Sequence, residues 1–163
     1  MSVRLLYALV LALMACVAPN MAHAQALALR WLGADGQVIA QKTLTLAELD
    51  TLPQTRIETG TPWTKGVNTF TGPSLGVLAA LGGRPVREAK VMALNDYVAP
   101  IPAEDWKDHG AILTTRLDGA TMRVRDKGPF WVMYPIDSDP ALGQQYFQSR
   151  MVWQVKSIDF IAQ

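Results

Sequence analysis

Aromatic side chains stand among turn-forming residues at several points of this chain, a pattern typical of binding sites for flat molecules. Trp63 lies in a segment rich in Gly, Pro and Thr, Tyr97 follows an Asn-Asp pair, and Trp131 follows Gly-Pro-Phe. Loops often carry binding residues, and flat rings can stack on a planar heterocycle while nearby polar groups pair with its edge. Packing in a core is the alternative for each ring, and it is the better explanation for Trp153, which lies in an alternating strand pattern.

Most other patterns that carry chemistry are missing from the sequence. No Gly-x-Ser-x-Gly elbow, phosphate-binding loop or dinucleotide fingerprint occurs. His109 precedes a glycine, which is typical of a surface turn rather than of a general base. Glu104, Asp105 and Asp108 lie close together, but acidic residues at the start of a helix are better explained by the helix dipole than by calcium binding.

The N-terminal segment 1–24 has the pattern of a secretory signal peptide. Arg4 precedes an apolar run over residues 5–18, and Ala22-His23-Ala24 is a small-x-small cleavage site. The run is shorter than the about 20 residues that cross a bilayer. We expect cleavage after Ala24 and a single periplasmic domain over residues 25–163. Lipoprotein processing at Cys16 is the alternative, since Leu-Met-Ala precedes this cysteine.

Composition excludes several classes of protein. The chain has one Cys, which lies in the predicted signal peptide, so the mature chain would have neither a disulfide nor a thiolate ligand. Its 15 Lys and Arg against 14 Asp and Glu give no basic surface for nucleic acid. A hydrophobic content of 50% excludes a wholly disordered chain.

Short strands dominate the elements that must position these side chains. Alternation and turn signals predict strands or extended segments over 27–32, 38–40, 55–59, 91–94, 98–102, 111–117, 121–124, 130–135 and 151–160. A capping box at Thr45 and Glu48 begins a short helix that ends by Pro53, and Ser74 caps a second helix that stops at Gly82-Gly83. A helical turn follows over 103–106, while 60–73 and 137–143 are expected to be loops. These elements predict an α+β fold, mainly mixed β-sheet with a few short helices.

Several segments together resemble the molybdopterin-binding domain of the sulfite oxidase superfamily. The resemblance covers about residues 40–160 and implies the α+β fold of that domain. The segments that carry it are Thr69-Phe70-Thr71-Gly72-Pro73-Ser74-Leu75, Leu78 with Leu81-Gly82, Ala93-Leu94-Asn95-Asp96-Tyr97, Ile101-Pro102, Ile112-Leu113, Leu117-Asp118-Gly119, Gly128-Pro129-Phe130-Trp131, Tyr134-Pro135, and Trp153 with Val155 and Ile158.

The resemblance also implies the position of a metal ligand. Enzymes of this superfamily bind molybdenum through a Cys on the loop after the strand predicted here over 55–59, and in some of them an aromatic residue follows that Cys by four positions. The residue four positions before Trp63 is Thr59, whose hydroxyl is a poor substitute for a thiolate. We therefore expect no metal and no catalytic residue. The alternative, a molybdopterin-dependent oxidoreductase, requires a metal held by Thr59 or by cofactor sulfurs alone.

A subgroup of small secreted proteins with this fold lacks the Cys and has a similar Trp-rich pattern. The resemblance to this subgroup implies a periplasmic, non-enzymatic protein that binds a reduced pterin. It also implies a partner, the periplasmic domain of a membrane signalling protein that is either a cyclic di-GMP enzyme or a sensor kinase. A structural module with a vestigial cleft is the remaining alternative.

For a pterin ligand we expect stacking, edge pairing and contacts to a polar tail. Trp63 and Trp131 would pack on or beside the ring, and Asp96 would accept from its amino-pyrimidine edge. Asp96 has an alternative role in capping a turn. Met133, Met151 and Phe147 are candidates for a docking surface or, alternatively, for the core. The full set of predicted ligand-binding residues is Trp63, Asn95, Asp96, Tyr97, Trp131, Arg56, Lys65 and Arg150.

Overall fold

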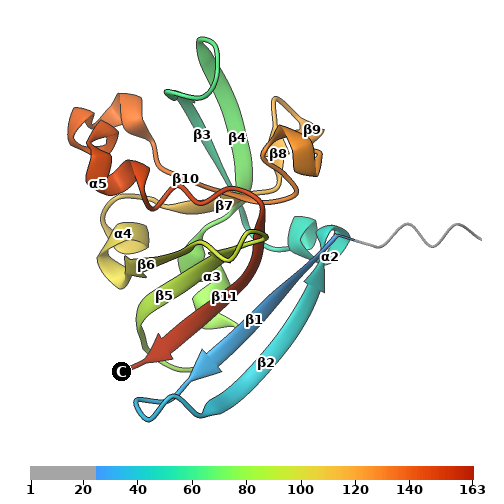
Figure 1. Ribbon diagram of the computed structural model, residues 1–163, viewed down its shortest axis with the longest axis vertical. Coiled ribbons are helices and arrows are strands. Elements are labelled where there is room, and N and C mark those ends of the chain that lie inside the picture. The colour runs from blue at the N-terminus through green and yellow to red at the C-terminus, as the bar shows by residue number, and fades with distance from the viewer. Residues whose placement is uncertain (1–24) are drawn as a thin grey trace, which may run out of the picture.

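The computed structural model describes residues 25–163, and the predicted signal peptide 1–24 lies outside the described residues. The described chain forms a five-stranded sheet, a four-stranded sheet and a two-stranded ribbon, joined by short helices. In Figure 1 the hairpin of β3 (Gln54–Gly60) and β4 (Val67–Pro73) projects away from the five-stranded sheet, and the two-stranded ribbon lies between them. No helix among residues 25–163 is long and apolar enough to cross a membrane.

The five-stranded sheet has the order β2-β1-β11-β5-β6. Its strands are β1 (Ala26–Leu32), β2 (Val38–Thr45), β5 (Val86–Ala93), β6 (Val98–Pro102) and β11 (Val155–Ala162). β1 and β11 run parallel, and the other neighbours are antiparallel. In β1 the alternating residues Leu27, Leu29 and Trp31 are fully buried, while Arg30 pairs with Asp159 of β11 on the opposite face. The sheet is mixed, as predicted.

The remaining strands form the four-stranded sheet and the two-stranded ribbon. The sheet has the order β3-β4-β8-β9, with β8 (Arg116–Leu117) and β9 (Ala120–Thr121), and the ribbon pairs β7 (Ile112–Thr114) with β10 (Trp131–Met133). Gly72 of β4 lies so close to β7 that an added Cβ would be 1.9 Å from the carbonyl oxygen of Leu113. This close approach explains a glycine inside a strand.

The predicted loop over 60–73 is wrong in its second half. Residues 67–73 form β4, which pairs with β3 along its whole length. Phe70 of β4 is fully buried and packs edge-on against Trp131, with ring centroids 5.7 Å apart. The Gly and Pro content of this segment conceals the strand, because the second pairing partner β8 and the core contact Trp131 are distant in sequence.

Within residues 25–163, four short α-helices and three 3₁₀ segments connect the strands. The α-helices are α2 (Leu46–Thr51), α3 (Leu75–Ala80), α4 (Ala103–Lys107) and α5 (Gln145–Gln148). The 3₁₀ segments are η1 (Val124–Asp126), η2 (Ile136–Ser138) and η3 (Pro140–Gly143). The predicted N-caps are confirmed, because Thr45 closes a capping box with Glu48 and the Ser74 hydroxyl accepts from the Val77 amide.

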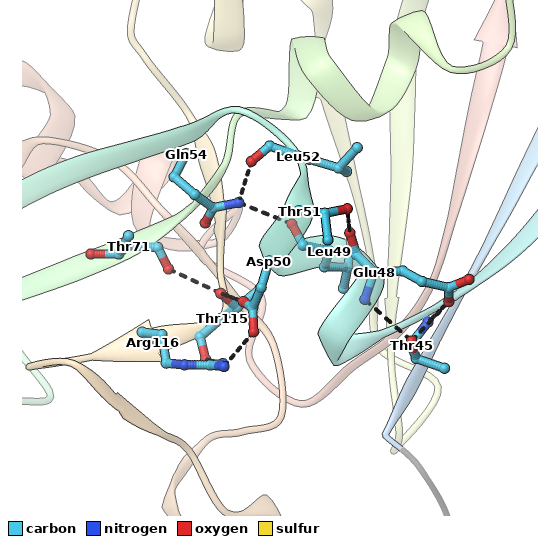
Figure 2. Close-up of polar contacts among 10 residues, drawn as sticks. All are labelled: Thr45, Glu48, Leu49, Asp50, Thr51, Leu52, Gln54, Thr71, Thr115 and Arg116. Atoms are coloured by element: carbon cyan, nitrogen blue, oxygen red, sulfur yellow. Dashed lines mark hydrogen bonds and ion pairs between the residues drawn. The ribbon is translucent and has the colours of Figure 1, made fainter.

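Figure 2 shows how α2 is fixed at both ends. The Thr45 hydroxyl and backbone amide donate to Glu48 Oε2 at 2.8 and 2.7 Å. Further along the helix, Asp50 accepts from the Thr115 hydroxyl at 3.2 Å and from the Arg116 guanidinium. α2 is thereby tied to the start of β8, so a six-residue helix that would be marginal alone is held by tertiary contacts.

Other element boundaries differ from the sequence prediction. The segment predicted as one strand over 111–117 is two strands, β7 and β8, separated by the buried Thr115. Of the predicted partner strand 121–124 only Thr121 pairs, together with Ala120 before it, and η1 begins at Val124. β2 runs on to Thr45 and β5 begins at Val86, because neighbouring strands continue the pairing beyond the local pattern.

Candidate functional site

A pocket of about 390 Å³ opens where three separate segments meet. These are the β3–β4 loop, the turn between β5 and β6, and the stretch 145–153 that begins with α5. The lining residues combine aromatic and apolar side chains with amides and one hydroxyl: Trp63, Ala93, Asn95, Tyr97, Gln145, Gln148, Ser149, Met151, Val152 and Trp153. The volume and lining fit a flat molecule of about two fused rings.

Three indoles form one cluster at the back of this pocket. Trp63 meets Trp153 edge-on with ring centroids 5.5 Å apart, and Trp131 lies 6.0 Å from Trp63 and 6.4 Å from Trp153. Trp131 is fully buried and donates its indole N–H to the carbonyl of Met151 at 3.0 Å. The structure therefore places Trp131 in the core behind the pocket, supporting the other two rings instead of lining the wall.

For Trp153 the sequence prediction was also wrong, since this residue was predicted in the core and lines the pocket. It was expected in the core of a strand over 151–160, but β11 begins only at Val155. Trp153 lies before the strand, makes an isolated bridge to Trp131 and is 37% exposed. Trp153 lines the pocket, and the chain here pairs with β10 of the ribbon before it enters the five-stranded sheet.

The turn between β5 and β6 brings Asn95 and Tyr97 to the pocket and turns Asp96 away. Asn95 Oδ1 accepts from the Tyr97 amide at 3.2 Å, and Asp96 has a left-handed backbone with φ of 65°. The Asp96 carboxylate is 81% exposed, pairs with Lys156 and does not line the pocket. Two of the three predicted residues of this turn therefore line the pocket.

The wall opposite this turn is α5 and the residues after it. Tyr97 donates its hydroxyl to the carbonyl of Ser149 at 2.8 Å, so one hydrogen bond joins two walls of the pocket. Gln148 donates from Nε2 to the carbonyl of Gly143 at 2.7 Å. Sequence reasoning missed Gln145, Gln148 and Ser149. The sequence pattern that could have indicated them is the run of glutamines beside Tyr146 and Phe147. Such a run is common on protein surfaces and does not by itself predict a binding site.

Arg150 is part of a buried ion pair behind α5. Its Nη1 donates to both carboxylate oxygens of Asp105 at 3.0 and 2.8 Å, and its guanidinium lies 3.8 Å from the centroid of the Tyr146 ring. Tyr134 donates its hydroxyl to the same carboxylate at 2.6 Å. Asp105 lies in the first turn of α4, as predicted, and the structure adds that it is buried and paired with Arg150. The charge of Arg150 is thus already neutralised within the protein.

This buried network holds Tyr134 in its neutral form. Burial and the hydrogen bond to Asp105 raise the pKa of Tyr134 far above its ordinary range. Tyr134 is therefore a hydrogen-bond donor to Asp105 throughout the physiological pH range. Together Tyr134 and Arg150 saturate the carboxylate and fix the position of the chain that follows α5.

The remaining predicted cations lie on the surface of the β3–β4 hairpin. Arg56 of β3 is exposed and pairs with Glu58. Lys65 lies in the β3–β4 loop and is exposed. Neither residue lines the pocket. Met133 and Met151 are buried, which agrees with the core alternative for these two residues, and Met151 also lines the pocket.

Thr59, the position that the resemblance assigned to a metal ligand, does not fit a metal site. Its side chain is fully buried, accepts from the Asp137 amide at 3.0 Å and donates to the carbonyl of Gly60 at 3.2 Å. Asp137 in turn accepts from the Gly60 amide at 2.8 Å. Within residues 25–163 no group of three or more His, Cys, Asp and Glu residues could hold a metal ion. The hydroxyl at this position therefore serves to join β3 to η2.

Comparison with known proteins defines the fold. The crystal structure of the sulfane dehydrogenase SoxCD from Paracoccus pantotrophus matches with a TM-score of 0.59 and 17% sequence identity. The match covers 83% of this chain and 38% of that chain. No family model matches the sequence, and no curated protein matches it. The predicted α+β fold of the sulfite oxidase kind is confirmed, and the likeness at this identity concerns the fold alone.

Proposed function

We propose that this protein is a periplasmic, non-enzymatic pterin-binding protein. The observation that carries the proposal is the pocket of about 390 Å³, whose lining combines Trp63 and Trp153 with amide side chains. A pterin is a flat bicyclic ring with an amide-like and an amidine-like edge. The indoles supply stacking surface, and Asn95, Gln145 and Gln148 supply donors and acceptors for that edge.

The expected strength of these contacts is sufficient for useful binding. Stacking of a flat base on one aromatic side chain is worth about 1–3 kcal/mol, and a hydrogen bond contributes about 0.5–1.5 kcal/mol. The planes of the two lining indoles stand at 71° to each other, so a flat ligand stacks on one ring and meets the other at its edge. One stacked ring, this edge contact, several amide hydrogen bonds and burial of the ligand's apolar surface together approach the about 8 kcal/mol of a micromolar Kd.

The absence of catalysis in this proposal is supported by the chemistry at Thr59. Both hydrogen-bonding directions of its hydroxyl are used within the protein, so a metal would have to displace the Asp137 amide and bind a hard oxygen in place of a thiolate. Elemental analysis of the protein purified from its native compartment tests this. Molybdenum at one equivalent per chain would favour the oxidoreductase alternative.

The proposed role of the bound pterin is to report its presence to a membrane signalling protein. Exposed apolar residues flank the pocket, among them Leu94, Val98 and Tyr146 at 47%, 41% and 58% exposure. A ligand that binds the partner-competent conformation more tightly raises the population of that conformation. We propose the periplasmic domain of a cyclic di-GMP enzyme or of a sensor kinase as the partner. Pull-down from membranes with and without pterin tests this, and equal recovery in both would contradict a ligand-dependent relay.

Binding itself is tested by titrating the purified protein with reduced and oxidised pterins while tryptophan fluorescence is recorded. The three indoles of the cluster lie within 6.4 Å of one another, so a stacked ligand should quench much of their emission. We expect saturable quenching with a Kd in the micromolar range or tighter. No change in emission and no ligand retained on equilibrium dialysis would support the alternative of a vestigial cleft.

A further inference from the structure

The wall of the pocket carries no charged side chain. None of its ten lining residues is Asp, Glu, Lys, Arg or His. The charged neighbours of lining residues in the sequence are already paired within the described chain. Asp96 binds Lys156, and Arg150 binds Asp105 with a guanidinium that is 9% exposed. Lys127 approaches the indole cluster, with Nζ 5.7 Å from the centroid of the buried Trp131 ring, but it does not line the pocket. A charged group entering the pocket would therefore lose water without gaining a counter-ion from the lining side chains.

Amide groups are the polar atoms that remain available in this wall. Gln145 makes no side-chain hydrogen bond within residues 25–163, and it is exposed. Gln148 uses Nε2 on Gly143 and keeps Oε1 without a partner there, and Asn95 uses Oδ1 on the turn and keeps Nδ2. These atoms are neutral donors and acceptors, so they match the edge of an uncharged heterocycle.

We infer that the pocket selects an uncharged, unphosphorylated heterocycle, and that Gln145 and Gln148 of α5 are among its ligand-binding residues. The inference rests on the proposed function only for naming the heterocycle as a pterin. Molybdopterin does not fit this selection, because it carries a phosphate, and a phosphate in this pocket would meet amides and indoles without a cation in the lining. Because an uncharged ligand needs no cation, Arg56, Lys65 and Arg150 need not reach it.

Matched pairs of probes test the selection. We would measure the affinity of the purified protein for 6-hydroxymethyl-7,8-dihydropterin and its phosphate ester, and for riboflavin and its phosphate ester FMN, by anaerobic equilibrium dialysis. We expect the unphosphorylated pterin to bind at least tenfold more tightly than its ester. Equal or tighter binding of the pterin ester would overturn the inference and leave pterin binding intact. Preference for riboflavin over FMN with no pterin bound would uphold the inference and overturn the pterin proposal. No binding of any probe would overturn both.

A charge substitution makes the test specific to the wall. Gln145→Lys places a cation in the pocket, and it should reduce the preference for the unphosphorylated pterin at least tenfold. Gln41→Lys adds the same charge to the exposed strand β2, away from the pocket, and should leave the preference within twofold of the parent. An equal effect of both substitutions, or none from Gln145→Lys, would show that the pocket wall does not set the selection.

Discussion

Trp153 and Trp63 are the residues on which ligand stacking depends, because they are the indoles that line the pocket. Trp131 is equally aromatic but fully buried, and its indole N–H is used on Met151. An aromatic side chain can therefore stack on a ligand only where its ring is also exposed to the pocket. A tryptophan of the core supports the site without touching what enters it.

Replacement of Trp153 by alanine should weaken pterin binding about tenfold, in the range expected for loss of one stacked ring. Trp153→Phe keeps a flat ring and should bind within about threefold of the parent. Isothermal titration with the same pterin compares the two. If Trp153→Ala binds as tightly as Trp153→Phe, the ligand does not stack on this ring.

Asp96 should contribute little to binding, since its carboxylate is exposed and pairs with Lys156 away from the pocket. Asp96→Asn is the suitable variant because asparagine tolerates the left-handed backbone at this position. We expect a Kd within twofold of the parent in the same titration. A tenfold loss of affinity would return Asp96 to the set of ligand-binding residues.

At the scale of elements, a capping box and a buried ion pair hold the short helices in place. The capping box fixes the start of α2, and the ion pair of Asp105 with Arg150 fixes the chain after α5. These ties are important because helices of four to six residues gain little stability from their own hydrogen bonds. Six of the ten pocket residues lie in 145–153, so the position of this stretch decides the shape of the site.

Loss of the α2 cap should lower stability by a modest and measurable amount. Thr45→Ala removes the hydroxyl of the capping box and should reduce the free energy of unfolding by about 1 kcal/mol. Thr45→Ser retains the hydroxyl and should stay within about 0.5 kcal/mol of the parent. Urea denaturation followed by circular dichroism measures both. Identical midpoints for the two variants would argue that the cap is not formed in solution.

Breaking the buried ion pair should affect both stability and binding. Arg150→Met leaves the Asp105 carboxylate buried without its cation and should cost about 3–5 kcal/mol. Arg116→Met is the control, because its pair with Asp50 is partly exposed, lies away from the pocket and should cost about 1 kcal/mol or less. Pterin affinity measured below the unfolding temperature should fall for Arg150→Met alone. Equal affinities in the two variants would mean that the ion pair does not position the wall.

At the scale of the whole molecule, exposed carboxylates link stability to pH. The Thr45 backbone amide and hydroxyl lower the pKa of Glu48 below its ordinary 4.5, and the Thr69 amide and Asn68 lower the pKa of Asp118 below 3.8. A depressed folded-state pKa stabilises the fold above the unfolded value, and this stabilisation is lost as pH falls through the folded value.

The Tm of the protein should therefore decrease as pH falls below about 4.5, where these groups are protonated first in the unfolded chain and, at lower pH, in the folded protein. Glu48→Gln with Asp118→Asn should flatten this part of the profile, since both groups then stay neutral. Differential scanning calorimetry across this pH range measures the slope. A double variant with the slope of the parent would show that other carboxylates control acid stability.

Much of the fold was predictable because its signals are local. The caps at Thr45 and Ser74, the turn before Val38 and the alternation in β1 involve residues within a few positions of one another, and the structure confirms them. The strand β4 was missed because its partners are β3 and β8, and local composition reports neither. Among the site residues, Trp63, Asn95 and Tyr97 were found because each stands out in its own segment.

The sequence by itself determined the chemistry that this protein can offer: a chain with no cysteine after residue 16, short strands that alternate, and indoles set among turns. The tertiary structure decided which of these groups meet. Sheet register and the pairing of Val152 and Trp153 with β10 bring α5 to the turn between β5 and β6, bury Trp131 and expose Trp153. The physical reason is that exposure and charge pairing depend on contacts between residues far apart in the chain, which a pattern of neighbours does not encode.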